Sequence, residues 1–250
     1  MYQEHTPDPR LSHLVECYWT STGYINSVVE SRILPDGCVD IVFTFNGENG
    51  QSNQRHINPR LVGTMTSYTL FTYTKKIDMM GIRFNPGAIR AFARMPIDEI
   101  TNAGVELQLA DTIFGKHAFE ALPEKKTTQE RISYINDYLI HTFGNILDLD
   151  SRIIFTVNKI KGCVGNIAIE TLSEQACLSQ RQLERRFKSV IGVSPKVFSR
   201  VIKFRNAVER IQTRSFQNLY EAAMACGYYD HAHLIKEFKA FSGKSPLAYM

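Results

Sequence analysis

The C-terminal part of the chain contains an internal repeat, which limits the fold more than any other feature of the sequence. When the chain is displaced by 51 residues against itself, the same residue types recur at special positions: Leu183 and Leu234, Phe187-Lys188 and Phe238-Lys239, Gly192 and Gly243, Ser194-Pro195 and Ser245-Pro246. Glycine, serine and proline each have a local structural role, so their shared spacing indicates that one structural unit occurs twice.

Each copy of the repeat has the pattern of a helix-turn-helix unit. Leu and Phe four residues apart share one helix face, the following Gly suits a helix end, and Ser-Pro suits the start of the next helix. A short amphipathic helix is expected upstream in each copy, at 167–177 and 219–227. Ser179 and Asp230 are the expected N-caps of the second helices. Such a second helix can enter a DNA major groove.

A long helical stretch at 195–214 joins the two copies. Its apolar stripe is formed by Phe198, Val201, Phe204, Val208 and Ile211. At about 1.5 Å per residue this helix would be about 30 Å long, close to the ~34 Å between successive major-groove faces. The spacing therefore allows two reading helices to occupy adjacent turns of one DNA duplex.

The outward faces of the two second helices carry residue types that read bases or contact phosphates. The expected contacts are Gln180, Arg181, Glu184, Arg185 and Lys188 in the first copy, and His231, Ala232, Ile235, Lys236 and Lys239 in the second. Arginine can bind guanine, glutamine adenine and glutamate cytosine, and Ile235 could contact a thymine methyl group. The alternatives are a solvated helix face for the charged residues and a buried contact for Ile235.

The distribution of charge favours DNA. Residues 151–250 carry a net charge of +9 and residues 1–150 a net charge of −5, which together give the total of +4. A basic part of an otherwise acidic chain suggests a polyanionic partner.

The N-terminal part of the sequence is β-rich. Strands are predicted at 13–20, 28–34, 39–45, 68–74 and 77–84, separated by turn residues, and a helix is predicted to start at Pro86. These short strands favour a small barrel or jelly roll. A helical pattern follows at 105–122. A second helix follows the capping box Thr127-Thr128-Gln129-Glu130, and its apolar stripe (Ile132, Ile135, Tyr138, Leu139) suggests interdomain packing plus dimerisation.

Residues of the N-terminal part do not predict an enzyme. The histidines at 5, 13, 56, 117 and 141 are isolated, so no metal or cofactor is expected. Cys38 is expected to be a small buried hydrophobe. Asp36, Asp40 and Arg83 are interpreted as turn caps and surface ion pairs, with pocket lining as the alternative.

Two segments of the repeat resemble the AraC/XylS-type double helix-turn-helix domain. They are Arg181-Gln182-Leu183-Glu184-Arg185-Arg186-Phe187-Lys188 with Gly192-Val193-Ser194-Pro195, and Ala225-Cys226-Gly227 through Leu234 with Phe238-Lys239 and Gly243-Lys244-Ser245-Pro246. The segments Leu34–Phe43 and Gly81–Gly87 look like the uncharacterised sensor domain of AraC-like regulators.

The resemblance implies a transcription regulator with a cupin-like or jelly-roll sensor domain, often dimeric. By motif position, it carries base-reading roles to Arg181, Gln182, Glu184 and Arg185, and to His231, Ala232, Ile235 and Lys236. Cys177 stands where the family usually has glycine, so the first turn is expected to be altered.

These observations predict a two-domain α+β protein. A β-rich sensor domain (1–104) precedes connecting and dimerisation helices (105–147) and a double helix-turn-helix domain (148–250). We expect a cytoplasmic, sequence-specific regulator of transcription that forms a homodimer. Its expected partners are double-stranded DNA, RNA polymerase and an unidentified small-molecule effector, with no membrane. The alternatives are a DNA-binding protein that needs no ligand, and a DNA-repair protein with Cys38 or Cys17 as a thiol alkyl acceptor.

Overall fold

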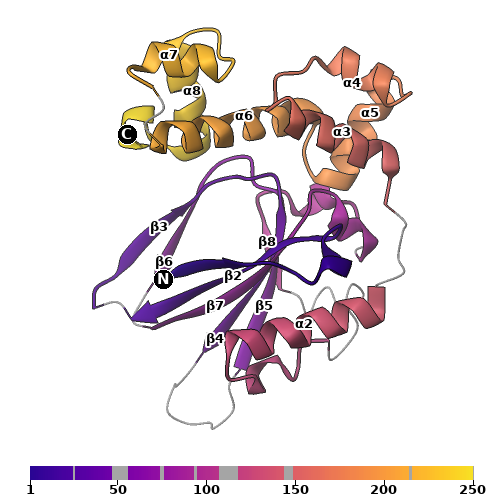
Figure 1. Ribbon diagram of the computed structural model, residues 1–250, viewed down its shortest axis with the longest axis vertical. Coiled ribbons are helices and arrows are strands. Elements are labelled where there is room, and N and C mark those ends of the chain that lie inside the picture. Colours follow the sequence, from indigo (N-terminus) through magenta and orange to yellow (C-terminus); the bar gives the residue numbers. More distant parts are fainter. Residues whose placement is uncertain are drawn as a thin grey trace.

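The computed structural model describes residues 1–24, 26–46, 56–73, 76–92, 95–106, 118–143, 149–213 and 216–249. It consists of a β-rich N-terminal domain and a helical C-terminal domain, as the sequence predicts (Figure 1). Within this part of the chain, no helix combines the length and the apolar character needed to cross a membrane.

The N-terminal domain contains two antiparallel sheets of unequal size. The larger sheet has the strand order β1-β2-β7-β4-β5-β8, and the smaller sheet pairs β3 with β6. The strands are β1 Tyr2–His5, β2 Val15–Tyr24, β3 Val29–Ile33, β4 Val39–Asn46, β5 His56–Val62, β6 Thr69–Tyr73, β7 Lys76–Phe84 and β8 Gly104–Glu106.

One face of the larger sheet forms the core of this domain together with helix α2 (Thr128–Phe143). Alternate residues of β4 and β7, among them Ile41, Phe43 and Ile82, are fully buried on this face. The predicted capping box starts α2. Glu130 accepts a hydrogen bond from the Thr127 amide at 3.1 Å, and the Thr127 hydroxyl accepts one from the Glu130 amide at 3.2 Å.

The apolar stripe of α2 packs within the chain. Ile132, Ile135 and Leu139 are buried in the N-terminal core, and Tyr138 is packed against it. The Tyr18 hydroxyl also donates to the Asn136 side chain at 2.7 Å, which ties α2 to β2. The predicted interdomain packing is therefore wrong for this stripe, because its residues belong to the core of the N-terminal domain itself.

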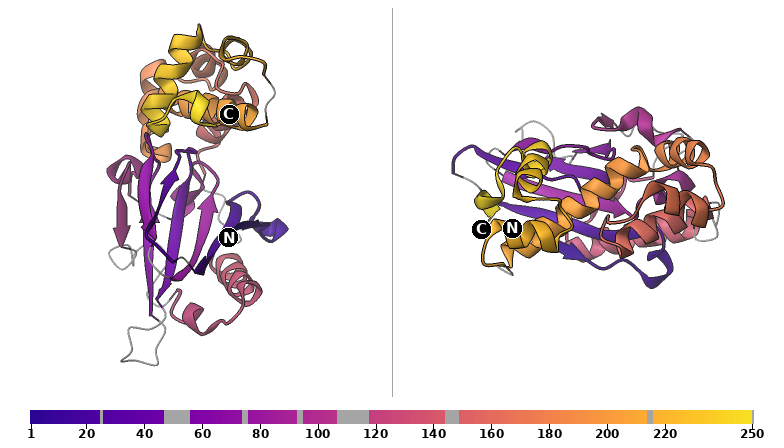
Figure 2. Two further views of the ribbon diagram at one scale, coloured as in Figure 1. Left: turned by 90° about the vertical axis from the view of Figure 1, so that its left-hand side faces the viewer. Right: turned by 90° about the horizontal axis from the view of Figure 1, so that it is seen from above.

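The C-terminal domain is built around one long helix. The helices are α3 Ser151–Gly162, α4 Ile169–Gln175, α5 Gln180–Ile191, α6 Pro195–Gln212, α7 Leu219–Ala225 and α8 His231–Ser242. Helix α6 lies across one end of the β-rich domain, with α3, α4 and α5 around one half and α7 and α8 around the other (Figures 1 and 2). All five residues of the predicted stripe of α6 are buried.

Three details differ from the sequence expectation. The helical pattern placed at 105–122 is wrong at its start, because Gly104–Glu106 is a strand paired with β5, and residues 107–117 lie outside the described residues. The predicted helix after Pro86 is a short 3-10 turn, Ala88–Ala91. Strands β1, β5 and β8 and helix α3 are elements that the pattern reading missed.

Candidate DNA-binding interface

Helix α5 is held at both ends by local sequence signals. Ser179 accepts a hydrogen bond from the Gln182 amide, and the Gln182 side chain accepts one from the Ser179 amide at 3.0 Å, which completes a capping box. Gly192 closes the C-terminal end in the left-handed conformation, at φ +95°. Leu183, Phe187 and Ile191 are buried, so the opposite face of the helix is fixed toward solvent.

The predicted contact residues of α5 share that outer face. Gln180, Arg181, Gln182, Glu184, Arg185 and Lys188 are all exposed. Two of them already have partners: the Gln182 side chain serves the capping box, and the Lys188 ammonium lies 3.8 Å from the Asp98 carboxylate of the N-terminal domain. The arginines at 181 and 185 therefore form the freely presented basic part of this face.

Helix α8 repeats the arrangement. Asp230 caps its N-terminus by accepting from the His233 amide at 2.7 Å, and Gly243 ends it at φ +68°. His231, Ala232, Lys236 and Lys239 are exposed, whereas Ile235 is half-buried. Ile235 is thus accessible only in part for the predicted methyl contact.

A buried ion pair that the sequence reading missed fixes α8 to α6. The guanidinium of Arg200 donates two hydrogen bonds, each 2.9 Å long, to the carboxylate of Glu237. Hydrogen bonding to Glu237 raises the pKa of Arg200. Two further side chains of α6 cap the end of α7: Lys203 donates to the Gly227 carbonyl at 3.1 Å and Arg210 to the Ala225 carbonyl at 3.0 Å.

The turn of each unit contains a residue in the left-handed conformation. Gly227 has φ +75° in the second turn, and Cys177 has φ +52° in the first. A side chain at such a φ costs roughly 1–2 kcal/mol relative to the right-handed form. The expected alteration of the first turn is therefore wrong for its backbone, because Cys177 adopts the same left-handed conformation as Gly227.

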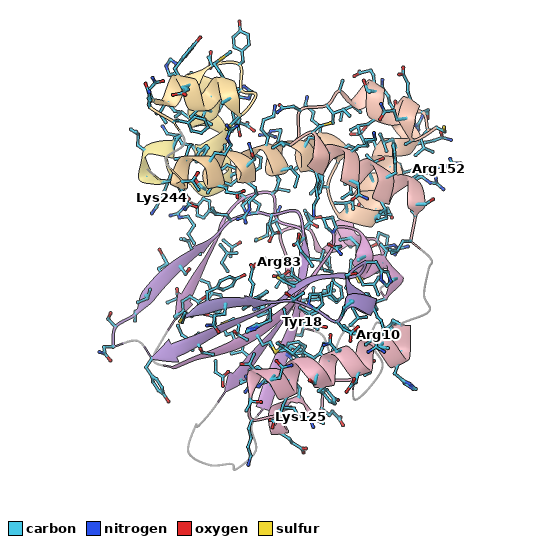
Figure 3. All side chains as sticks on the ribbon, viewed as in Figure 1. Arg10, Tyr18, Arg83, Lys125, Arg152 and Lys244 are labelled. Carbon is cyan, nitrogen blue, oxygen red and sulfur yellow. The ribbon has the colours of Figure 1, made fainter. Side chains whose placement is uncertain are left out.

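A compact charged cluster in the N-terminal domain joins the two motif segments of the sensor resemblance. The guanidinium of Arg83 (labelled in Figure 3) lies 3.3 Å from the Asp36 carboxylate, 3.4 Å from Asp40 and 3.3 Å from Glu4. The indole of Trp19 donates to Asp40 at 3.0 Å.

Burial perturbs the ionisation of this cluster. Burial raises the pKa of Asp40 to about 7. The negative charge of Asp36 raises this pKa further, whereas the positive charge of Arg83 lowers it. Burial alone would lower the pKa of Arg83, but Asp40 and Asp36 outweigh it and raise the value. The expected ion pairs are present, but their expected position at the surface is wrong, because the side chains of Arg83, Asp36 and Asp40 are largely buried.

The cysteines of this domain are poorly placed to act as nucleophiles. Cys38 is buried and its thiol donates to Glu16 at 3.2 Å, and burial raises the pKa of both Cys38 and Cys17, the latter to about 12. A thiol with a raised pKa is protonated at neutral pH and reacts slowly. Among the described residues, no group of His, Cys, Asp or Glu is arranged to hold a metal ion.

The paired helix-turn-helix units, with basic outer faces, define the chain as a DNA-binding protein. Residues 172–250 match a family described as a helix-turn-helix domain, and residues 3–106 match a domain of unknown function, DUF6597. The C-terminal domain is therefore a helix-turn-helix domain, and these findings support a DNA-binding regulator of transcription.

Solved structures similar to the whole chain are those of ToxT from Vibrio cholerae. An apo ToxT variant is 11% identical, with 93% of this chain and 96% of that chain covered and a TM-score of 0.48. A 1.65 Å structure of ToxT is 12% identical, with 93% and 97% covered and a TM-score of 0.47. A third, with (E)-4-(8-methylnaphthalen-1-yl)but-3-enoic acid bound to ToxT, is 10% identical, with 99% and 97% covered and a TM-score of 0.44. No curated protein matches the chain.

Proposed function

We propose that this protein binds specific double-stranded DNA sequences by placing α5 and α8 in successive major grooves, without catalysing a reaction. The N-terminal domain senses a small molecule, and the protein acts in the cytoplasm, where it contacts RNA polymerase directly or through its position on DNA. Binding as a homodimer belongs to the same proposal.

One observation carries the proposal: the two recognition helices expose equivalent positions of the repeat, and both pack on the single helix α6. Arg185 and Lys236 are both exposed and stand 51 residues apart, and both helices pack on α6. With 18 residues, α6 is about 27 Å long. Two basic helices packed on one helix of that length suit consecutive turns of one DNA face better than two unrelated sites.

The packing of helix α2 into the core of its own domain supports a sensing role for the N-terminal domain. The apolar stripe of α2 is buried in the core of its own domain, so this stripe is not free to form a dimer seam. Ligand sensing therefore explains the separate β-rich domain more economically than dimerisation through α2.

The test is selection of DNA fragments from a random library by the full chain, followed by affinity measurements on the recovered sequence. Arg181→Ala should cost about 1–3 kcal/mol at one base pair and relax the preference there. Arg186→Ala is the matched control, because Arg186 lies on the same helix but faces Asp150 at 3.7 Å. Lys239→Ala should weaken binding to all sequences and reduce the salt slope by about 0.9 if it contacts a phosphate.

The result that would reject the proposal is equal binding to all fragments, or a recovered sequence to which Arg181→Ala and Arg186→Ala bind as the wild type does. A thermal-shift screen against metabolites tests the sensing part, since a ligand of the folded state raises its stability. No shift with any metabolite of a broad panel would favour the ligand-independent alternative.

The alkyl-acceptor alternative has its own readout. Mass spectrometry after exposure to alkylated DNA would show a methyl adduct on Cys38 or Cys17. The burial and raised pKa of both thiols lead us to expect none.

A further inference from the structure

Both recognition helices end against the N-terminal domain. The last carbonyls of a helix lack partners within it and need donors from elsewhere. At the end of α5, the Thr64 hydroxyl donates to the Ile191 carbonyl and the Thr101 hydroxyl donates to the Gly192 carbonyl at 2.6 Å. At the end of α8, the Arg32 guanidinium donates to the Ser242 carbonyl.

The two contacts fall on the same position of the repeat. Ile191 and Ser242 stand 51 residues apart, and each is followed by the glycine that ends its helix. A Cβ atom on Gly192 would lie 3.0 Å from the Thr101 hydroxyl oxygen, and one on Gly243 would lie 2.5 Å from the guanidinium of Arg32. The repeated glycines therefore serve two purposes: they allow the left-handed turn, and they let the N-terminal domain approach the helix ends.

Each helix is held by a different sheet. Arg32 belongs to β3, and its guanidinium stacks 4.1 Å from the ring centre of Tyr68, which immediately precedes β6. Strands β3 and β6 form the smaller sheet, which reaches the end of the helical domain that carries α8 (Figure 1). Lys244, beside this contact, lies next to the tips of these strands (Figure 3).

The contact with α5 comes from the larger sheet. Thr64 lies two residues after the end of β5, and Thr101 follows the 3-10 turn Ile97–Ile100, which leads into β8. The Asn102 amide donates to the Thr64 carbonyl at 3.0 Å, and the Gly63 amide donates to the Ala103 carbonyl at 3.0 Å, so the two threonines are held together at this edge of the sheet. Rotation of one sheet against the other would move one recognition helix relative to its counterpart.

We propose that Thr64, Thr101 and Arg32 are positioning residues that set the relative placement of the two recognition helices, so that the N-terminal domain fixes the half-site spacing the protein accepts. This inference rests on the proposed function. Helix α6 fixes the distance between the two units, and the second connection through the sheets restricts their rotation about α6. A ligand that changes the angle between the sheets changes the spacing preference without touching DNA.

The experiment uses the full chain and the DNA site recovered by selection, with its native spacer and with one base pair inserted or deleted. One base pair rotates the second half-site by about 34–36°. We expect the wild type to bind the altered spacers about tenfold more weakly, because one recognition helix then misses its bases. The variants are Thr64→Val with Thr101→Val, and separately Arg32→Leu, which remove the donors at one helix each.

Arg32→Leu should lose about fivefold of the discrimination between spacers, the usual effect of one hydrogen bond on an equilibrium. The double valine variant removes two hydrogen bonds and should lose at least as much. The base preference within each half-site should stay as in the wild type. The conservative pair Thr64→Ser with Thr101→Ser keeps the hydroxyls and should restore the spacer discrimination. Arg32→Gln is a second test at the α8 end should Arg32→Leu prevent folding.

Matched controls come from the same domain. Arg60 donates to the Gly104 carbonyl at 3.0 Å and the Thr66 hydroxyl contacts Asn102, both within the N-terminal domain. Arg60→Leu and Thr66→Val should leave the spacer discrimination unchanged. Variants that discriminate spacers as the wild type does would overturn the inference while leaving the proposed function intact, and so would an equal loss in the controls. Absence of any sequence-specific binding by the wild type would refute the proposed function, and the inference with it.

Discussion

The ion pair between Arg200 and Glu237 offers a sharp test of how the second unit is held to α6. The side chain of Glu237 is 8% exposed, whereas that of Arg200 is 43% exposed. Arg200→Leu would leave a buried carboxylate without its two hydrogen bonds. Breaking a buried pair from one side typically costs about 3–5 kcal/mol. Because Arg200 is nearly half exposed and the nearby Lys203 also interacts with Glu237, we expect a loss of about 2–3 kcal/mol.

Urea denaturation of the full chain measures this loss, with far-UV circular dichroism following the helices. Trp19 is the only tryptophan of the sequence, so its fluorescence reports on the N-terminal domain separately. Arg200→Leu should lower the helical transition and leave the Trp19 transition near its wild-type position. Adding Glu237→Gln should recover part of the loss, because a neutral amide costs less to bury than a carboxylate.

The exposed pair of Arg186 and Asp150, 3.7 Å apart, provides the control: Arg186→Leu should cost less than about 1 kcal/mol. A cost equal to that of Arg186→Leu would refute the buried-charge reasoning.

Three further changes have expected outcomes. Cys177→Gly should raise the free energy of unfolding of the helical domain by about 1 kcal/mol in urea, because φ is +52° there. Gly192→Ala should lower it by at least that amount and weaken DNA binding, because φ is +95° and the new Cβ would press on Thr101. Asp40 binds its proton more tightly in the folded chain, with a pKa of about 7 against 3.8, so its contribution to stability falls as pH rises from about 4 to about 7. Asp40→Asn should remove that slope from the Trp19 transition, and a slope equal to that of the wild type would contradict the raised pKa.

The helical domain was predictable from the sequence because its signals are local. Ser179, Asp230 and Ser194 cap helices as expected, and Gly192 and Gly243 end them in the left-handed conformation. Helix α3 had a readable signal as well, since Asp150 precedes an apolar spacing at Ile153, Val157 and Ile160. The 51-residue repeat gives no indication of this helix, because α3 lies before it.

Strand β5 was not predicted from the sequence, for a physical reason. Pro59 lies in its middle, and a proline normally argues against a central strand because it lacks an amide donor. Within the described residues, β8 pairs with Arg60, Leu61 and Val62, and on its other side Pro59 is paired with Phe43 of β4. The pairing partner that makes β5 an inner strand comes from 40 residues downstream, which a local pattern does not show.

The contacts between the domains had no sequence signal at all. Threonine is common in ordinary turns, so Thr64 and Thr101 do not stand out in the sequence. Only the fold brings their hydroxyl groups to the end of α5. The buried pair of Arg200 and Glu237 is similar, because both residues read as parts of solvated helix faces until α6 and α8 are packed. Long-range polar contacts of this kind depend on tertiary placement, which periodicity and capping rules do not fix.

The structure shows how the acidic and basic domains lie relative to the two ends of the recognition helices. The C-terminal ends of α5 and α8 contact the acidic domain, and two ion pairs cross the boundary, Lys188 with Asp98 and Lys161 with Glu16 at 3.4 Å. Arg181 and His231, at the other ends of the helices, lie about 15 Å along the helix axes from those contacts, since each is ten or eleven residues from its last carbonyl. Helix dipoles place positive charge at those same N-terminal ends. DNA is therefore attracted to the side with the helix N-termini and repelled from the acidic domain, so the charge asymmetry that first suggested a polyanionic partner also determines the side from which that partner approaches.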